Sequence, residues 1–90
     1  MLNRLEILER AAQLTAGDRD TVHGSAEKNF ERVAALWSAY LDIELSAHDV
    51  AVLQALFKIA RIKGNPQHGD NWIDMSGYGA LGGEIAGAKP

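Results

Sequence analysis

Residues 58–78 read Lys-Ile-Ala-Arg-Ile-Lys-Gly-Asn-Pro-Gln-His-Gly-Asp-Asn-Trp-Ile-Asp-Met-Ser-Gly-Tyr, and this stretch decides the fold. It begins as the end of an apolar helix, which Gly64-Asn65-Pro66 stops because proline lacks the backbone donor that a helix interior needs. A second helix then begins near Asp70. So short a turn makes the two helices antiparallel neighbours, and the stretch therefore predicts a helical hairpin.

The rest of the chain also has helical periodicity, and no segment alternates as a strand does. Ser25 is placed as an N-cap, and Ser46 with Asp49 has the spacing of a capping box. The expected helices span about residues 2–15, 25–41, 46–63 and 70–87. We therefore expect an all-α fold in which residues 1–90 form a single four-helix domain.

Composition limits the classes of function. The 90 residues are 47% hydrophobic, carry a net charge of −3 and contain no cysteine, which excludes disulfides and thiolate metal sites. No apolar run approaches the roughly 20 residues of a membrane span, and no dense basic patch indicates nucleic acid as a partner. The N-terminus is not typical of a signal peptide, so a cytoplasmic protein is expected.

Two helices carry patterns that predict contact with another copy of the chain. The helix over residues 46–63 is apolar around most of its circumference, and a helix of this kind is normally surrounded. In the next helix Gly79, Gly83 and Gly87 recur every four residues, which predicts the close approach of another backbone. We therefore expect a homo-oligomer that associates through the third and fourth helices.

The hairpin gathers charges that form the first candidate site. Lys58 and Arg61 lie one helical turn apart on the helix before the hairpin turn. Asp70 and Asp74 are likewise one helical turn apart on the helix after it. The pairs can meet as structural salt bridges that close the hairpin. Alternatively, Lys58 and Arg61 bind a phosphate while Asp74 or Asn71 contacts a base or ribose. The sequence leaves both interpretations open.

Other polar residues interrupt apolar faces or precede a helix. Asn29 is expected to be buried on the apolar face of the second helix, where it would need hydrogen-bond partners. Asp74 and Tyr78 share a half-buried face of the last helix. His23 lies in the loop before the second helix, whose free backbone amides suit an anion.

Catalytic and metal-binding patterns are incomplete. The three histidines lack ligand spacing, and no serine has an evident partner base, so no catalytic residue is assigned. A carboxylate site for Mg²⁺ would rest on Asp70 and Asp74, because Glu27 and Glu31 lie opposite the apolar face of their helix. Two carboxylates are too few within one chain, so no cofactor is expected unless the protein is an enzyme.

Several short motifs occur in a fixed order along the chain. They are His23-Gly24-Ser25, Asn29-Phe30, Trp37-Ser-Ala-Tyr40-Leu41, Asp49-Val-Ala, Leu56-Phe-Lys58-Ile-Ala-Arg61 and Asp70-Asn-Trp72-Ile-Asp74-Met-Ser-Gly77-Tyr78. Through these motifs the chain resembles, over about residues 3–86, an uncharacterised family of small all-helical proteins encoded by phages and prophages. That family is distantly similar to the MazG-like nucleotide pyrophosphohydrolases, although the paired Glu-x-x-Glu and Glu-x-x-Asp signatures of those enzymes are absent here. The resemblance implies pocket positions at His23, Asn29, Trp37, Lys58, Arg61, Asp70, Asp74 and Tyr78.

Three functions follow as expectations. The leading one is a phage-type nucleotide-binding protein that sequesters a cyclic or ADP-ribose-type signal of host immunity in the host cytoplasm. The alternative is a Mg²⁺-dependent, MazG-like pyrophosphohydrolase whose site takes carboxylates from a neighbouring subunit. The third is a structural or protein-binding helical oligomer.

Overall fold

The computed structural model describes residues 1–16 and 25–90, so the expected ligand role of His23 lies outside the described residues. This part of the chain contains helices and no strand, which confirms the all-α prediction. The helix boundaries lie close to those expected from the sequence. The helices are α1 (Arg4–Ala16), α3 (Ala26–Leu41), α4 (Ala47–Gly64) and α5 (Gly69–Ile85).

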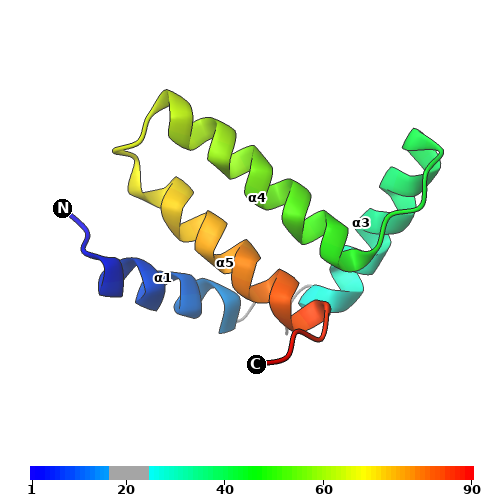
Figure 1. The fold of residues 1–90 in the computed structure, drawn as a ribbon, viewed down its shortest axis with the longest axis horizontal. Helices are drawn as coiled ribbons and strands as arrows, with labels where there is room; N and C mark the ends of the chain where they lie inside the picture. The colour runs from blue at the N-terminus through cyan, green and yellow to red at the C-terminus, as the bar shows by residue number, and fades with distance from the viewer. Residues whose placement is uncertain (17–24) are drawn as a thin grey trace.

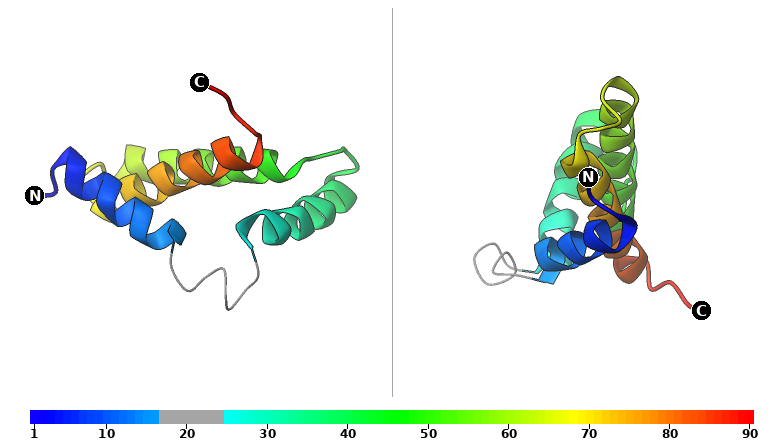
Figure 2. Two further views of the ribbon diagram at one scale, coloured as in Figure 1. Left: turned by 90° about the horizontal axis from the view of Figure 1, so that it is seen from below. Right: turned by 90° about the vertical axis from the view of Figure 1, so that its left-hand side faces the viewer.

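The α4–α5 hairpin is the centre of the arrangement. The two helices run antiparallel side by side, and α5 lies between α4 and α1 (Figure 1). Helix α3 packs against α4 near the N-terminal end of that helix (Figure 1). Helices α1 and α3 lie on the same side of the hairpin, one towards each end of it (Figure 2). The C-terminal end of α1 therefore faces the N-terminal end of α3 across the hairpin.

Local hydrogen bonds define the helix ends. The Ser25 side chain caps α3, and Ser46 with Asp49 forms the predicted capping box of α4. Asn3 and Glu6 form a second reciprocal pair at the start of α1, which the sequence analysis missed. In the hairpin turn, the Trp72 indole N–H donates to the Pro66 carbonyl at 2.8 Å. This bond ties the turn to α5.

The capping box makes the stability of α4 depend on pH. Hydrogen bonds donated by the Ser46 backbone N–H and hydroxyl hold the pKa of Asp49 below its ordinary value of 3.8. The Asp49 carboxylate therefore stabilises the fold above that ordinary value, and its contribution is lost as the pH falls through the lowered pKa. Wild type should have a higher melting temperature than Asp49→Asn at neutral pH, and the gap should close in acid. A gap that stays unchanged as the pH falls far below 3.8 would contradict this assignment.

The core of the single chain consists mainly of small side chains. Its buried apolar residues are Ala11, Ala34, Val50, Ala51 and Ile73. Helices α4 and α5 approach closely at Gly82, where an added Cβ would lie 2.9 Å from the Ala51 Cβ. Within one chain the glycine stripe meets no other backbone, because Gly79 and Gly83 face open space among the described residues and Gly87 lies beyond the end of α5. The close approach of another copy of the chain stays a prediction.

These glycines offer a matched pair of substitutions in one helix. Gly82→Ala should lower the free energy of unfolding by about 1–3 kcal/mol, because the new methyl group collides with Ala51. Gly79→Ala should raise it by about 0.5–1 kcal/mol, because the site is open and alanine favours a helix. Urea unfolding of both variants measures the difference. Equal effects at the two positions would contradict the α4–α5 packing.

The expectation that α4 is surrounded is not met within one chain. Five of its large apolar residues are exposed, namely Val52, Leu53, Leu56, Phe57 and Ile59. The inward side of α4 carries Val50 and Ala51, which are buried, and Lys58, which is partly buried. The single chain therefore covers only one side of this helix.

Candidate functional site

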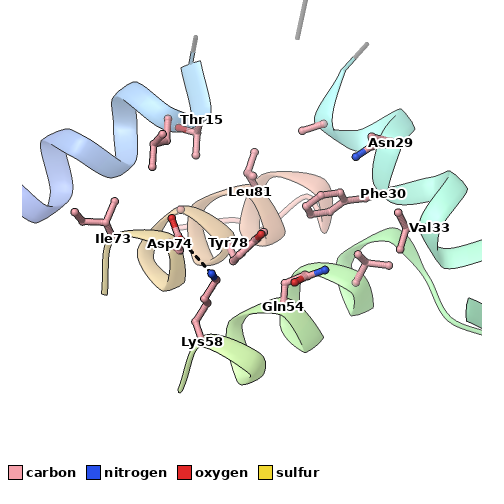
Figure 3. A pocket seen from close by; sticks show the side chains of 14 residues that line it. Thr15, Asn29, Phe30, Val33, Gln54, Lys58, Ile73, Asp74, Tyr78 and Leu81 are labelled. Atoms are coloured by element: carbon pink, nitrogen blue, oxygen red, sulfur yellow. Dashed lines mark ion pairs between the residues drawn. The ribbon is translucent and has the colours of Figure 1, made fainter. Parts of the chain in front are cut away.

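A pocket of about 600 Å³ lies where the end of α1 faces the start of α3, with α4 and α5 forming its other walls (Figure 3). This volume falls within the range of about 300–1,000 Å³ that is typical of small-ligand sites. Each helix in the described part of the chain contributes to the lining. The lining residues are Leu14 and Thr15 from α1, Ala26, Asn29, Phe30 and Val33 from α3, Val50, Gln54 and Lys58 from α4, and Ile73, Asp74, Gly77, Tyr78 and Leu81 from α5.

An ion pair between Lys58 and Asp74 crosses the hairpin at the pocket. The Lys58 Nζ lies 3.0 Å from an Asp74 carboxylate oxygen, and the two side chains are 14% and 33% exposed (Figure 3). Partial burial reduces the screening that makes surface ion pairs weak. The salt bridge that the sequence left as one of two interpretations is therefore present between Lys58 and Asp74. Because both residues also line the pocket, the pair can serve the hairpin and a ligand at once.

Aromatic side chains form a second part of the pocket. The rings of Phe30 and Tyr78 lie with their centroids 6.4 Å apart and their planes tilted by 34°. This separation is typical of packed aromatic pairs. The two rings come from α3 and α5, and Figure 3 shows them on one side of the pocket. They offer an apolar surface on which a planar group can stack.

Neutral polar groups complete the pocket, and some of them were missed. Asn29 was predicted as a site residue, but Thr15 and Gln54 were not. Gln54 lies four residues before Lys58 on the same narrow polar stripe of α4, so helical spacing could have identified it. Thr15 could not be identified in this way, because its position depends on how α1 packs against the hairpin.

The other two candidate charges, Arg61 and Asp70, lie outside the pocket and have other neighbours. Arg61 lies over the ring of Phe57, with its guanidinium carbon 4.6 Å from the ring centroid. The Asp70 side chain is 77% exposed in the first turn of α5, 3.9 Å from His68. Because Asp70 and Asp74 are one helical turn apart, both were candidates for the same site. The structure shows instead that the Asp70 side chain extends into solvent. Only Lys58 and Asp74 of the four charges line the pocket.

The structure also separates the remaining candidates. Asn71 is buried on α5 but does not line the pocket, and Trp37 is half-buried on α3 outside it. The predicted burial of Asn29 is wrong, because this residue is exposed at the edge of the pocket. The same side of α3 carries Leu36 and Tyr40, which are also exposed. The pocket thus brings together Asn29, Lys58, Asp74 and Tyr78.

Comparison with known proteins places the chain in a family. A family model described as a domain of unknown function, DUF6378, matches residues 6–86. The chain belongs to this family. It is 47% identical over 72 residues to the Gene 55 protein of Mycobacterium phage D29, covering 80% of this chain and 48% of the relative. It is 40% identical over 78 residues to the Gene 55 protein of Mycobacterium phage L5, covering 86% and 50%.

These matches support the predicted resemblance to an uncharacterised phage protein family. The chain spans about half the length of the two phage relatives. No solved structure matches the DUF6378 chain. Among the described residues, no helix combines the length and apolar character that crossing a membrane requires.

The DUF6378 chain also contains a cluster of serine, histidine and aspartate. The Ser46 hydroxyl lies 3.1 Å from the His48 Nδ1 and donates to the Asp49 carboxylate at 3.0 Å. In a catalytic triad the histidine stands between the serine and the aspartate. Here the serine bonds directly to the aspartate and caps α4, so the cluster is structural.

Donors for a metal ion are sparse in residues 1–16 and 25–90. No three His, Cys, Asp or Glu side chains in these ranges are grouped so that they could hold a metal ion. Asp74 is paired with Lys58, and Asp70 extends into solvent. A Mg²⁺ site would therefore need donors beyond this set.

Proposed function

We propose that this DUF6378 chain binds a small nucleotide-type ligand in the pocket between α1, α3 and the hairpin, and that it acts by binding without turnover. The observation that carries the proposal is the Lys58–Asp74 pair beside the Phe30–Tyr78 rings in one pocket of about 600 Å³. A ligand with a planar ring and a polar group matches this combination.

The chemistry of the pocket assigns a role to each group. The Lys58 ammonium has three donors, so it can bind a phosphate oxygen while it remains near Asp74. The Asp74 carboxylate can accept a hydrogen bond from a ribose hydroxyl or a base N–H. Tyr78 supplies a ring for stacking against the base, and the Asn29 amide can donate or accept at the pocket edge.

Charge narrows the ligand class. Lys58 and Asp74 are the charged residues that line the pocket in the described part of the chain, and their charges cancel. A triphosphate brings several negative charges that one paired lysine cannot balance. The pocket therefore favours a nucleoside, a monophosphate, or a cyclic or ADP-ribose-type nucleotide over a triphosphate. In a phage protein, stoichiometric binding of such a molecule would sequester a nucleotide signal of host immunity.

A calorimetric comparison of two tyrosine variants tests the stacking role. Tyr78→Ala should weaken binding by about 10–100-fold, because stacking of a base on an aromatic ring contributes about 1–3 kcal/mol. Tyr40→Ala removes the same side chain from the exposed end of α3 and should leave the affinity unchanged. An equal loss in both variants, or no loss in Tyr78→Ala, would contradict the proposed site.

A hydrolysis assay distinguishes binding from the alternative enzyme. Release of pyrophosphate from deoxynucleoside triphosphates in the presence of Mg²⁺ would overturn the binding-only proposal and favour a MazG-like activity. That activity would require carboxylates from outside the described residues, such as those of a neighbouring chain, because Asp70 and Asp74 do not form a metal site within the described residues. We expect no release above a control without protein.

A further inference from the structure

The outward side of α4 is an apolar surface that the single chain leaves open. Val52, Leu56 and Ile59 are 52%, 54% and 46% exposed. At about 100° per residue, these three positions lie on the side of the helix opposite Lys58, which contacts α5. Figure 1 shows α4 at the outer edge of the arrangement, with α5 between it and α1. We call residues 49, 52, 53, 56, 59, 60 and 63 the outer face of α4.

The chain exposes more surface than a compact protein of its size. Its accessible surface is 6741 Å², whereas a folded monomer of 9.7 kDa exposes about 5,100 Å². A standard protein interface buries about 800 Å² on each partner. The excess of about 1,600 Å² is therefore large enough to supply one full interface. Large exposed apolar patches of this kind mark sites of association.

The outer face of α4 is complementary to a reversed copy of itself. Asp49 and Lys63 lie seven residues on either side of Leu56, and the apolar residues between them are also placed symmetrically around it. In an antiparallel pair centred on Leu56, Asp49 of each copy therefore meets Lys63 of the other. The N-terminal end of each helix then lies beside the C-terminal end of its partner, which the helix dipoles also favour. An unrelated partner would have no reason to match this symmetry.

We propose that two copies of this chain associate through the outer face of α4, with the two helices antiparallel across a twofold axis near Leu56. A twofold axis makes the same residues face each other in both copies, as the symmetric pattern requires. The apolar residues form the centre of the interface, and the Asp49–Lys63 pairs form its two ends. The pocket lies on the other side of α4, so the dimer leaves both pockets accessible and does not depend on the proposed ligand.

A single engineered cysteine tests the position of the axis. Packed helices lie about 8–10 Å apart, and their Cα atoms lie about 2.3 Å from each axis, so facing Cα atoms are about 3.4–5.4 Å apart. A disulfide joins Cα atoms about 4.4–6.8 Å apart, so it fits the upper part of this range. The chain contains no cysteine, so Leu56→Cys introduces the only thiol. Under mild oxidation it should form a covalent dimer in high yield. Leu8→Cys, at a similarly exposed position on α1, is the control and should not.

The mass in solution tests the same interface without a cross-link. Wild type should sediment as a dimer at micromolar concentration. Leu56→Glu should raise the dissociation constant by about 100-fold, because it places two carboxylates at the centre of the interface. Leu8→Glu should not change it. Because Leu56 is more than half exposed in the single chain, the variant should keep its helical circular dichroism.

Three outcomes would overturn the proposal. The first is a monomeric wild type at all concentrations, with its outer face free or covered by another protein. The second is a dimer that Leu56→Glu does not weaken. The third is cross-linking of Leu8→Cys as efficient as that of Leu56→Cys. A larger assembly in which Leu56→Cys still links pairs of chains would support the α4 contact.

Discussion

Exchanging the charges of the pocket pair, by Lys58→Asp together with Asp74→Lys, is expected to keep the protein folded and to abolish ligand binding. The exchange preserves an ion pair across the hairpin, so the free energy of unfolding should stay close to that of the wild type. The exchange moves the positive charge from α4 to α5, however. A phosphate that binds at position 58 in the wild type would then face the new carboxylate at that position. Loss of binding by at least about 100-fold is expected, because two close like charges replace an attraction.

The single variants separate the two roles of the pair. Lys58→Met should lower the free energy of unfolding by about 1–2 kcal/mol, because it leaves the partly buried Asp74 carboxylate without its partner. Lys89→Met removes an exposed lysine beyond the end of α5, away from the pocket and from the outer face of α4, and should change neither stability nor affinity by much. If the exchanged variant bound the ligand as well as wild type, the pair would be purely structural. If the exchanged variant were less stable than Lys58→Met, the contact between positions 58 and 74 would be in doubt.

The largest loss of stability is expected for Ile73→Ala. Ile73 is 3% exposed on α5 and is one of the few large side chains that are buried among the described residues. Removing it should cost about 2–4 kcal/mol through lost burial and the cavity left behind. The melting temperature should fall by roughly 10–30 °C, which a small domain with little reserve can hardly tolerate.

A second isoleucine provides the control for this variant. Ile43 follows the end of α3 and is 57% exposed, so Ile43→Ala should change the free energy of unfolding by no more than about 0.5 kcal/mol. Thermal and urea unfolding of the two variants should be compared at the same protein concentration. Similar losses at both positions would show that Ile73 is not the centre of the core.

The features that the sequence predicted depend on residues close together along the chain. The capping box of Ser46 and Asp49 and the turn at Gly64-Asn65-Pro66 are local, so helix boundaries could be predicted closely. The Lys58–Asp74 pair was one of two open interpretations, and it was available because a short turn aligns two antiparallel helices. Asp70 does not join this pair, because its side chain extends into solvent in the first turn of α5.

The features that the sequence did not predict depend on how separate helices meet. The pocket exists because the end of α1 faces the start of α3, and periodicity within a helix carries no information about that placement. Periodicity also identifies apolar faces without showing what covers them. Leu56 lies on a helix that was expected to be surrounded, yet it is exposed in the single chain. The proposed α4 pairing would cover Leu56.

Calorimetric titration of the wild-type protein with nucleosides, monophosphates, cyclic dinucleotides, ADP-ribose and triphosphates tests nucleotide binding most directly. At least one ligand of low charge is expected to bind more tightly than 1 mM, which corresponds to about −4 kcal/mol, and more tightly than its triphosphate. The absence of binding below about 1 mM across the whole panel would contradict the proposed function.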